Sequence, residues 1–349
     1  MGISDLIASF LQESLEETDG GVLEVQRNDL AQRFNCVPSQ INYVMSTRFS
    51  PERGYIVESR RGGNGYIRIT RVRIETENGA KAMGKPVGTY ITMEAPEMAV
   101  PDEAYHREIS VELAKFLAGF LKCDKEDLSV LVVGLGNRKV TPDALGPLVV
   151  DNLNITRHIV KEYGKYAMGE EQARLVSAIV PGVMGQTGME TVEIVRGVVA
   201  ETEPDGIIAV DALAARSSRR LNRTIQISDT GISPGSGVGN HRGGLTRETV
   251  GVPVIAIGIP TVVDAATIVN DTMENLIAAL ETSEALRGVG VVLQGYTAAE
   301  KYDLVRELIS PHLNGLFVTP KDIDDTIRRI SYTLSEALNL LFSGKAKEA

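Results

Sequence analysis

The segment "LSVLVVGLGNRKVTPDALGPLVVD", residues 128–151, decides the fold class. It begins with a continuous apolar run, which predicts a β-strand buried on both faces, and continues through a glycine turn and a loop into a helical pattern. The same order of strand, loop and helix returns further along the chain. We therefore expect an α/β fold, a three-layer α/β/α domain with a mostly parallel sheet. Further strands are expected at 174–180, 205–213, 224–229 and 252–263, and helices at 189–202 and 264–281.

Two aspartates lie where predicted strands end. Asp143 is in "VTPDALGP", beyond the strand that ends at Gly134, and Asp211 is at the carboxyl end of "IIAVD". Open α/β sheets bind ligands at that edge. Burial of Asp211, and repulsion if Asp143 approaches it, should raise a pKa, so that the pair holds one proton and can activate water and protonate a leaving amide. In the structural alternative, Asp143 caps the next helix and Asp211 binds backbone amides.

Other catalytic motifs are absent from the sequence. "GLGN" follows a strand, but no third glycine opens a helix, so it does not complete a dinucleotide-binding fingerprint. No P-loop, GxSxG or HExxH motif occurs, and the histidines have no zinc-site spacing. Cys36 and Cys123 lie far apart without CxxC spacing, which suits a reducing compartment. We expect no metal and no cofactor.

The first seventy residues follow a winged helix-turn-helix pattern. Two short helices, "RNDLAQRF" and the segment from Pro38, precede the glycine-tipped ribbon "YIVESRRGGNGYIRI". Amide and arginine side chains on the second helix suit the major groove of DNA, and arginines at the ribbon tip suit the minor groove. A small helical domain with a solvated basic hairpin is the alternative. The candidate DNA-binding residues are Gln40, Asn42, Tyr43, Arg48, Arg60, Arg61 and Asn64.

Length and charge agree with two domains. The chain has 349 residues and a net charge of −10. Residues 22–69 carry seven arginines against four acidic residues, whereas the chain from Thr70 onward carries 29 basic and 37 acidic residues. The N-terminal segment has no basic n-region, and no apolar run is long enough to span a membrane. We expect a soluble cytoplasmic protein with no membrane partner.

The N-terminal segment "CVPSQINYVMSTRFSPERGYIVESRRGGNGYIRI" resembles the DNA-binding domain of the class-three stress gene repressors (CtsR), over residues 1–69. The resemblance implies DNA as a partner. That family continues into a helical dimerisation domain, which has no counterpart in this sequence. Because one winged helix makes few phosphate contacts, dimeric operator binding would need another source of symmetry.

Most of the remaining chain resembles the germination proteases of spore-forming bacteria. The similar blocks include "VVGLGN", "VTPDALGP", "VPGVMGQTGMET", "AVDALAARS" and "GVPVIAIGIPTVVDA", and the resemblance runs from Thr70 to the C-terminal helix. It implies a fold related to the hydrogenase maturation endopeptidases, and an atypical aspartic endopeptidase in which Asp143 and Asp211 are the catalytic residues. It further implies a homo-oligomer, a tetramer, that degrades small acid-soluble spore proteins inside the germinating spore.

Other residues in these blocks receive weaker assignments. Gly182, Gly185 and Gly188 should shape a loop beside the acids, and Glu190 either supports that loop or binds substrate. The glycine-rich block "SPGSGVGNHR" can bind a peptide carbonyl or an acidic side chain, since the family cleaves beside glutamate. Its candidate substrate-binding residues are Asn240, His241 and Arg242.

The two resemblances meet at Ile69 and Thr70, which predicts domains at 1–69 and 70–349. No Gly, Ser or Pro spacer separates them, so either the second ribbon strand continues into the protease sheet or the chain bends within a residue or two. The winged helix stands where the family has its pro-segment and first mature residues, so the family's zymogen control does not carry over directly.

Two other functions stay open at this point. In one, the chain is a DNA-binding repressor of stress genes, and its protease-like body is inactive and serves oligomerisation. In the other, the aspartates are metal ligands, as in the hydrogenase-processing relatives.

Overall fold

The computed structural model divides the chain into two compact units, residues 1–61 and 62–349. All the candidate DNA-binding residues, and the candidate substrate-binding residues 240–242, lie outside the residues whose placement is described. The described residues are 67–121, 125, 127–164, 167, 174–235, 243–282, 302, 304, 305, 307, 308, 313 and 315–344, together with 7, 10, 11, 33, 34, 36 and 44 in the first unit.

In the first unit, the described residues form part of a small apolar core. Ile7 and Leu11 are buried and helical. The ring of Phe10 meets the ring of Phe34 edge-on, with 5.5 Å between centroids, and the guanidinium of Arg33 lies 4.1 Å from the Phe10 centroid. Aromatic contacts therefore join two segments that are more than twenty residues apart in the sequence.

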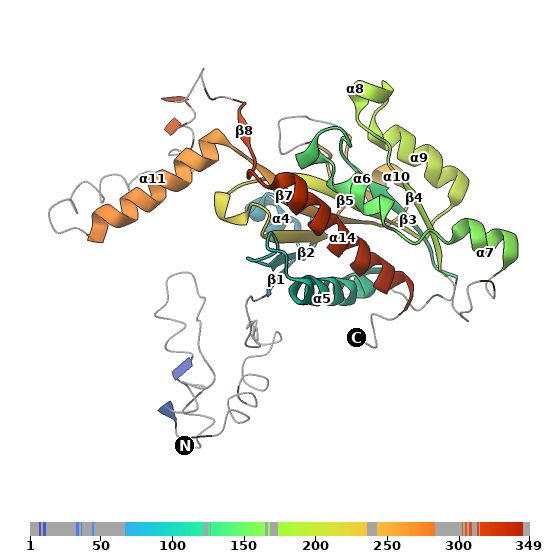
Figure 1. The fold of residues 1–349 in the computed structure, drawn as a ribbon, viewed down its shortest axis with the longest axis horizontal. Coiled ribbons are helices and arrows are strands. Elements are labelled where there is room, and N and C mark those ends of the chain that lie inside the picture. The colour runs from blue at the N-terminus through green and yellow to red at the C-terminus, as the bar shows by residue number, and fades with distance from the viewer. Residues whose placement is uncertain are drawn as a thin grey trace. The chain divides into compact units, whose positions relative to one another are not determined.

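The second unit is built on one sheet, which has eight strands among the described residues (Figure 1). Seven strands lie in the order β1-β2-β6-β7-β5-β3-β4, and β8 pairs with β7. Most residues of the central strands β3, β5 and β7 are buried, as the continuous apolar runs predict. The strands are β1 (Arg68–Ile74), β2 (Gly88–Glu94), β3 (Ser129–Gly134), β4 (Leu175–Ile179), β5 (Gly206–Ala215), β6 (Thr224–Ser228), β7 (Val254–Asp264) and β8 (Phe317–Val318).

The sheet is mixed, so the prediction of a mostly parallel sheet is wrong. Strands β4, β3, β5 and β7 are parallel to one another, but β6 runs antiparallel to β7, and β2 and β1 continue the antiparallel part. The link from β5 to β6 contains only the 3₁₀ turn η4 (Ser218–Arg220). Such a short link reverses the chain, because a parallel return needs a longer crossover.

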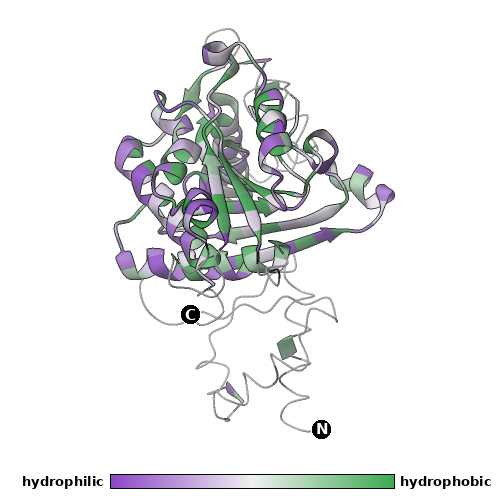
Figure 2. Ribbon diagram, turned by 90° about the vertical axis from the view of Figure 1, so that its right-hand side faces the viewer, coloured by the Kyte–Doolittle hydropathy of each residue, from purple (hydrophilic) through white to green (hydrophobic). Residues whose placement is uncertain are grey.

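One face of the sheet is covered by α5 (Glu103–Leu121), α6 (Leu145–Asp151) and α14 (Ile323–Phe342). Leu113 of α5 and Leu338 of α14 are fully buried in the core cluster that also contains Ile208 of β5. The hydropathy colours of Figure 2 show apolar strands in the interior and polar outer helix faces. This face supplies the larger of the two cores.

The opposite face of the sheet is covered by α9 (Thr191–Thr202) and α10 (Arg247–Val250). Val195 of α9 packs in the second core cluster with Leu131 of β3 and Ile207 of β5. Two helix layers therefore enclose the sheet, and the predicted three-layer α/β/α fold is confirmed. The other helices in the described part of the chain are α4 (Glu77–Met83), α7 (Arg157–Tyr163), α8 (Met184–Thr187) and α11 (Ala265–Thr282).

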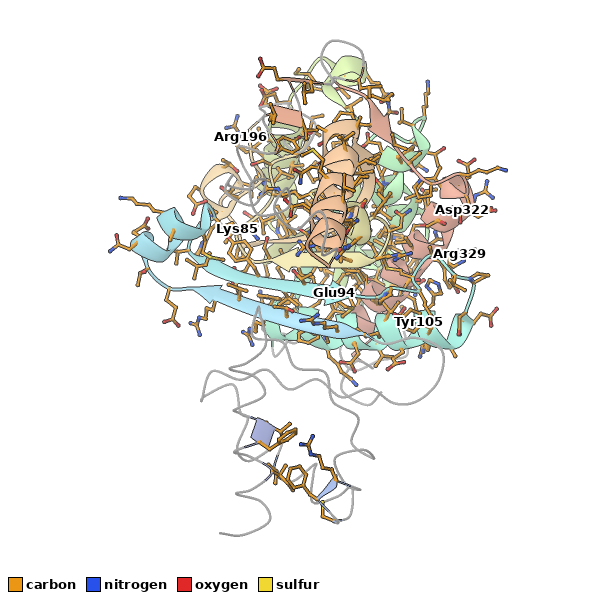
Figure 3. All side chains as sticks on the ribbon, turned by 90° about the vertical axis from the view of Figure 1, so that its left-hand side faces the viewer. Lys85, Glu94, Tyr105, Arg196, Asp322 and Arg329 are labelled. Carbon is orange, nitrogen blue, oxygen red and sulfur yellow. The ribbon has the colours of Figure 1, made fainter. Side chains whose placement is uncertain are left out.

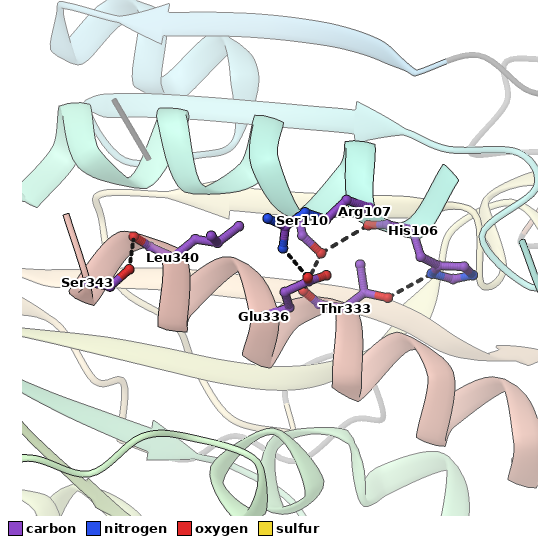
Figure 4. Close-up of polar contacts among 7 residues, drawn as sticks. All are labelled: His106, Arg107, Ser110, Thr333, Glu336, Leu340 and Ser343. Atoms are coloured by element: carbon purple, nitrogen blue, oxygen red, sulfur yellow. Dashed lines mark hydrogen bonds and ion pairs between the residues drawn. The ribbon is translucent and has the colours of Figure 1, made fainter. Parts of the chain in front are cut away.

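A buried polar contact joins α5 to α14, and we call it the α5–α14 seam: His106, Ser110 and Thr333 (Figure 4). The His106 ring lies 2.7 Å by Nδ1 from Oγ1 of Thr333 and 3.0 Å by Nε2 from the carbonyl oxygen of Val100. The hydroxyl of Ser110 bonds the carbonyl oxygens of both His106 and Thr333, each at 3.0 Å. At the rim, the guanidinium of Arg107 pairs with the carboxylate of Glu336.

Strand β1 passes without a break through Ile69 and Thr70, where the two resemblances meet. Its residues pair with β2 in continuous register, from Arg68 opposite Glu94 to Ile74 opposite Gly88. Figure 3 shows this hairpin at the edge of the sheet, with Glu94 labelled on β2. The strand thus continues into the sheet, whereas the domain boundary at 69/70 itself stays a prediction.

No helix in the described part of the chain is both long enough and apolar enough to cross a bilayer.

Candidate active site at the carboxyl ends of the parallel strands

Asp211 lies where two neighbouring strands differ in length. Strand β3 ends at Gly134, opposite Val210, whereas β5 continues to Ala215 along β7. Asp211 is thus the first residue of β5 beyond the end of β3. The sequence led us to expect that its own strand ends at Asp211, but β5 continues to Ala215. The Asp211 side chain is only 4% exposed, and Oδ1 accepts the backbone N–H of Ala212 at 2.9 Å.

Asp143 belongs to the loop that fills the space beyond β3. It ends the 3₁₀ turn η2 (Thr141–Asp143), which packs against β5 and β7. Its Oδ2 accepts the backbone N–H of Asn137 at 2.6 Å. The following helix α6 has Ala144 at its N-cap and no side-chain cap, so the described contacts do not support the alternative that Asp143 serves as a helix cap.

Glycines allow this loop to pack tightly against the strand ends. A Cβ atom on Gly136 would lie 2.0 Å from the backbone oxygen of Asp143, and the φ of Gly136 is 116°. A Cβ on Gly146 would lie 2.5 Å from the carbonyl oxygen of Val210, the residue before Asp211. Both positions therefore exclude any larger residue, and the glycines bring the Asp143 loop against the strand that carries Asp211.

The electrostatics of Asp211 follow from this placement. Burial, and then the charge of Asp143, raise the pKa of Asp211 to about 7, while the hydrogen bond from Ala212 lowers it. Burial disfavours the carboxylate because it removes water, and a neighbouring negative charge disfavours it further. The direction agrees with the expectation from the sequence. Below about pH 7, the buried acid therefore holds a proton.

The segment that follows β4 also contacts the loop between β3 and Asp143, through Gln186 of α8. The Nε2 of Gln186 donates to Oδ1 of Asn137 at 3.1 Å, and that oxygen also accepts the backbone N–H of Lys139 at 3.0 Å. Asn137 and Gln186 were not assigned to the site from the sequence. A polar residue directly after a glycine turn at a strand end is the signal that could have found Asn137.

Glu190 lies at the start of α9, and its contacts are structural. Its N–H donates to the carboxylate of Glu193 at 2.8 Å, and its own Oε2 accepts the backbone N–H of Gly243 at 3.2 Å. The carboxylate thus ties α9 to the segment that follows residues 240–242. Substrate binding by Glu190 stays a prediction, as it does for Asn240, His241 and Arg242.

The described residues contain no group of three His, Cys, Asp or Glu side chains that could hold a metal ion. A shallow hollow lies instead at the amino ends of the parallel strands, lined by Lys125, Ser129, Arg157 and Asp205 among others. It is at the edge of the sheet opposite the two acids, because Ser129 begins β3 and Asp211 lies beyond its end. We therefore place the candidate active site at the acids and not at the hollow.

The sequence comparisons identify two families. The germination protease family matches residues 45–284, and the N-terminal helix-turn-helix domain of CtsR matches residues 2–73. The two matches overlap over residues 45–73, which include the segment predicted to form the glycine-tipped ribbon and most of β1.

Individual germination proteases are similar over most of their length. That of Caldanaerobacter subterraneus is 51% identical over 285 residues, which cover 81% of this chain and 87% of the relative. That of Clostridium tetani is 45% identical with the same coverage, and that of Bacillus subtilis is 40% identical over 329 residues, covering 85% and 88%. The chain therefore belongs to the germination protease family and is a peptidase, with an N-terminal helix-turn-helix domain of the CtsR type.

Proposed function

We propose that this chain is an endopeptidase that degrades small acid-soluble spore proteins in the spore interior, with Asp143 and Asp211 as its acid pair. Membership of the germination protease family supports the activity. The observation that carries the site is that Asp211 is buried directly beyond the end of β3, where Gly146 lets the Asp143 loop pack against the preceding residue, Val210. This burial and the charge of Asp143 raise the pKa of Asp211 to about 7. A raised pKa on one of two interacting carboxyl groups is how a site keeps an acid and a base together.

In the proposed reaction, the two acids have different roles. Asp211 begins protonated, and Asp143 begins as the carboxylate, because the Asn137 N–H bonds its charged form. A water proton moves to Asp143 as the water oxygen bonds the carbonyl carbon, and the C=O electron pair moves onto the carbonyl oxygen. Asp211 then gives its proton to the amide nitrogen as the C–N bond breaks. The products are a carboxylic acid and an amine, and the pair again holds one proton.

Digestion of a purified small acid-soluble spore protein by the full-length chain tests this mechanism. We expect Asp143→Asn and Asp211→Asn each to lower kcat/KM by about 10²–10⁴-fold, the usual contribution of a general acid or base. Asp325→Asn is the matched control, since Asp325 is exposed on α14 and pairs with Arg328 of the same helix. Undiminished cleavage by both variants of the pair would remove the aspartates from catalysis.

We also propose that the N-terminal domain binds DNA, and the match to the CtsR helix-turn-helix domain favours this second function. The proposed contacts are the amides on the second helix and the arginines of the ribbon, as given above. A homotetramer, proposed from the family resemblance, would supply the symmetry that a paired operator needs.

Fluorescence anisotropy with a duplex of two tandem heptanucleotide sites tests the DNA proposal. We expect Arg61→Ala to weaken binding and Asp211→Asn to leave it unchanged. Equal affinity for a scrambled duplex would contradict sequence-specific binding. Operator binding by a wild-type chain that cleaves no spore protein would instead favour the repressor with an inactive protease body.

A further inference from the structure

Peptide hydrolysis by an acid pair needs a group that stabilises the carbonyl oxygen. Water attack places negative charge on that oxygen, and a preorganised hydrogen-bond donor lowers the energy of the transition state. The carboxyl groups of Asp143 and Asp211 are occupied with proton transfer in the proposed reaction. The donor must therefore come from another residue close to them.

Asn137 combines a neutral side-chain donor with direct contact to one member of the pair, Asp143. Its backbone N–H already donates to Oδ2 of Asp143 at 2.6 Å. The side-chain amide of the same residue therefore lies close to the Asp143 carboxylate, which activates water in the proposed reaction. Asn137 is half-buried, so a bound peptide could reach the amide while water would be partly excluded.

The side-chain amide of Asn137 is held in one orientation. Its Oδ1 accepts the backbone N–H of Lys139 at 3.0 Å and Nε2 of Gln186 at 3.1 Å. A backbone N–H can only donate, so the amide oxygen and not the nitrogen must face Lys139. The Nδ2 group, on the other branch of the planar amide, has no acceptor among the described residues. A fixed donor without an acceptor in the described part of the chain is suited to bind a substrate oxygen.

We infer that Asn137 is a further catalytic residue, whose side-chain N–H donates a hydrogen bond to the scissile carbonyl oxygen. The inference rests on the proposed acid-pair mechanism. As water bonds the carbonyl carbon, the C=O electron pair moves onto the oxygen, and Nδ2 of Asn137 strengthens its hydrogen bond without giving up a proton. Gln186 is a positioning residue, because it acts only by holding Oδ1 of Asn137.

Two substitutions of Asn137 separate donation to substrate from a role in the turn. Asn137→Ala removes both the donor and the turn acceptor. Asn137→Asp keeps an oxygen for the Lys139 N–H, since Asp forms this kind of turn as well as Asn, but it removes the donor. We expect both variants to lose about 10²–10³-fold in kcat with KM changed by less than about threefold, as for other lost oxyanion donors.

The controls keep the outcome interpretable. Asn78→Ala, at an exposed position on α4, should retain wild-type kcat, and Gln186→Ala should lose about tenfold because one of two orienting bonds remains. Each variant is measured over pH 5 to 9, so that a shift in the Asp211 titration is seen apart from a loss of rate. If Asn137→Ala fails to fold, Asn137→Asp and Gln186→Ala still decide the question.

The possible failures are distinct. Recovery of activity by Asn137→Asp, with Asn137→Ala inactive, would reduce Asn137 to a structural role and overturn the inference. Full activity of Asn137→Ala beside an inactive Asp211→Asn would also overturn it, while leaving the acid pair intact. Full activity of both aspartate variants would show that the proposed mechanism itself fails.

Discussion

Asp211 and His106 are both buried ionisable side chains, but their surroundings differ. His106, in the α5–α14 seam, contacts a hydroxyl with one ring nitrogen and a backbone carbonyl with the other. Within the described part of the chain, Asp211 accepts one hydrogen bond, from the next backbone N–H, and has a second carboxyl group nearby. In the seam both ring nitrogens of His106 have partners, whereas at the strand ends the ionised form of Asp211 would be poorly compensated.

The two sites consequently respond to pH in opposite directions. Burial lowers the pKa of His106 below its usual 6.5, so it stays neutral in the folded protein, and the carbonyl of Val100 requires the hydrogen on Nε2. Burial raises the pKa of Asp211, so it stays protonated. The protonation of His106 in the unfolded chain therefore lowers the stability of the fold as the pH falls below about 6.5. The ionisation of Asp211 in the unfolded chain lowers the stability as the pH rises from 3.8 to about 7. The buried His106, whose ring nitrogens both have hydrogen-bond partners, supports the fold, whereas the buried carboxyl group of Asp211 is available for catalysis.

The largest effect that we expect is a change in the unfolding free energy when Asp211 is replaced by Asn. Asp211 ionises near pH 3.8 in the unfolded chain and near pH 7 in the folded chain. This difference of about three pKa units lowers the unfolding free energy above pH 7 by at most about 4 kcal/mol. We expect Asp211→Asn to be more stable than wild type at pH 8 and about equal to it at pH 4. Urea unfolding at both pH values measures the difference. An equal gain at pH 4 would mean that the titration of Asp211 is not its cause.

The second effect concerns the rate. Because Asp211 must be protonated to act as the acid, kcat/KM should fall about tenfold per pH unit above pH 7, or about a hundredfold by pH 9. Initial rates of spore-protein cleavage between pH 5 and 9 test this. Thr333→Val, in the seam, should leave the profile unchanged. A flat profile up to pH 9 would assign the proton donor to another group.

The third effect is expected when a hydrogen-bond partner is removed from the α5–α14 seam. Thr333→Val keeps the side-chain shape but removes the hydroxyl that meets Nδ1 of His106, leaving a buried ring nitrogen without its partner. We expect a loss of about 1–3 kcal/mol in unfolding free energy at pH 7, with kcat within twofold of wild type. Urea unfolding and the cleavage assay measure the two quantities. A loss of activity without a loss of stability would connect the seam to catalysis.

The smallest effect is expected at the rim of the seam. Arg107 and Glu336 form an ion pair that is partly open to solvent. Arg107→Ala should change the unfolding free energy by less than about 1 kcal/mol, and high salt should remove even that. Thermal unfolding at low and high ionic strength tests this. A change as large as that of Thr333→Val would mean that the pair supports the buried contacts behind it.

The local pattern of the sequence predicts the parallel half of the sheet well. Apolar runs locate β3, β5 and β7, and the strand-end rule locates Asp143 and Asp211. The antiparallel half was missed because the direction of β6 depends on the shortness of its link to β5, which apolar periodicity does not report. Asn137 was missed although it directly follows a glycine turn at a strand end, because its contact with Asp143 is a backbone hydrogen bond, formed as the loop folds back on itself.

The unbroken β1 strand limits how the chain can be divided. A fragment that begins at Thr70 would lose two of the seven β1 residues that pair with β2, and with them the Arg68–Glu94 ion pair. Protease cleavage at Ile69 would likewise have to open a hydrogen-bonded ladder instead of a free tether. Separating the protease from its helix-turn-helix partner is therefore best attempted upstream of Arg68, and insertions at the junction should be tolerated poorly.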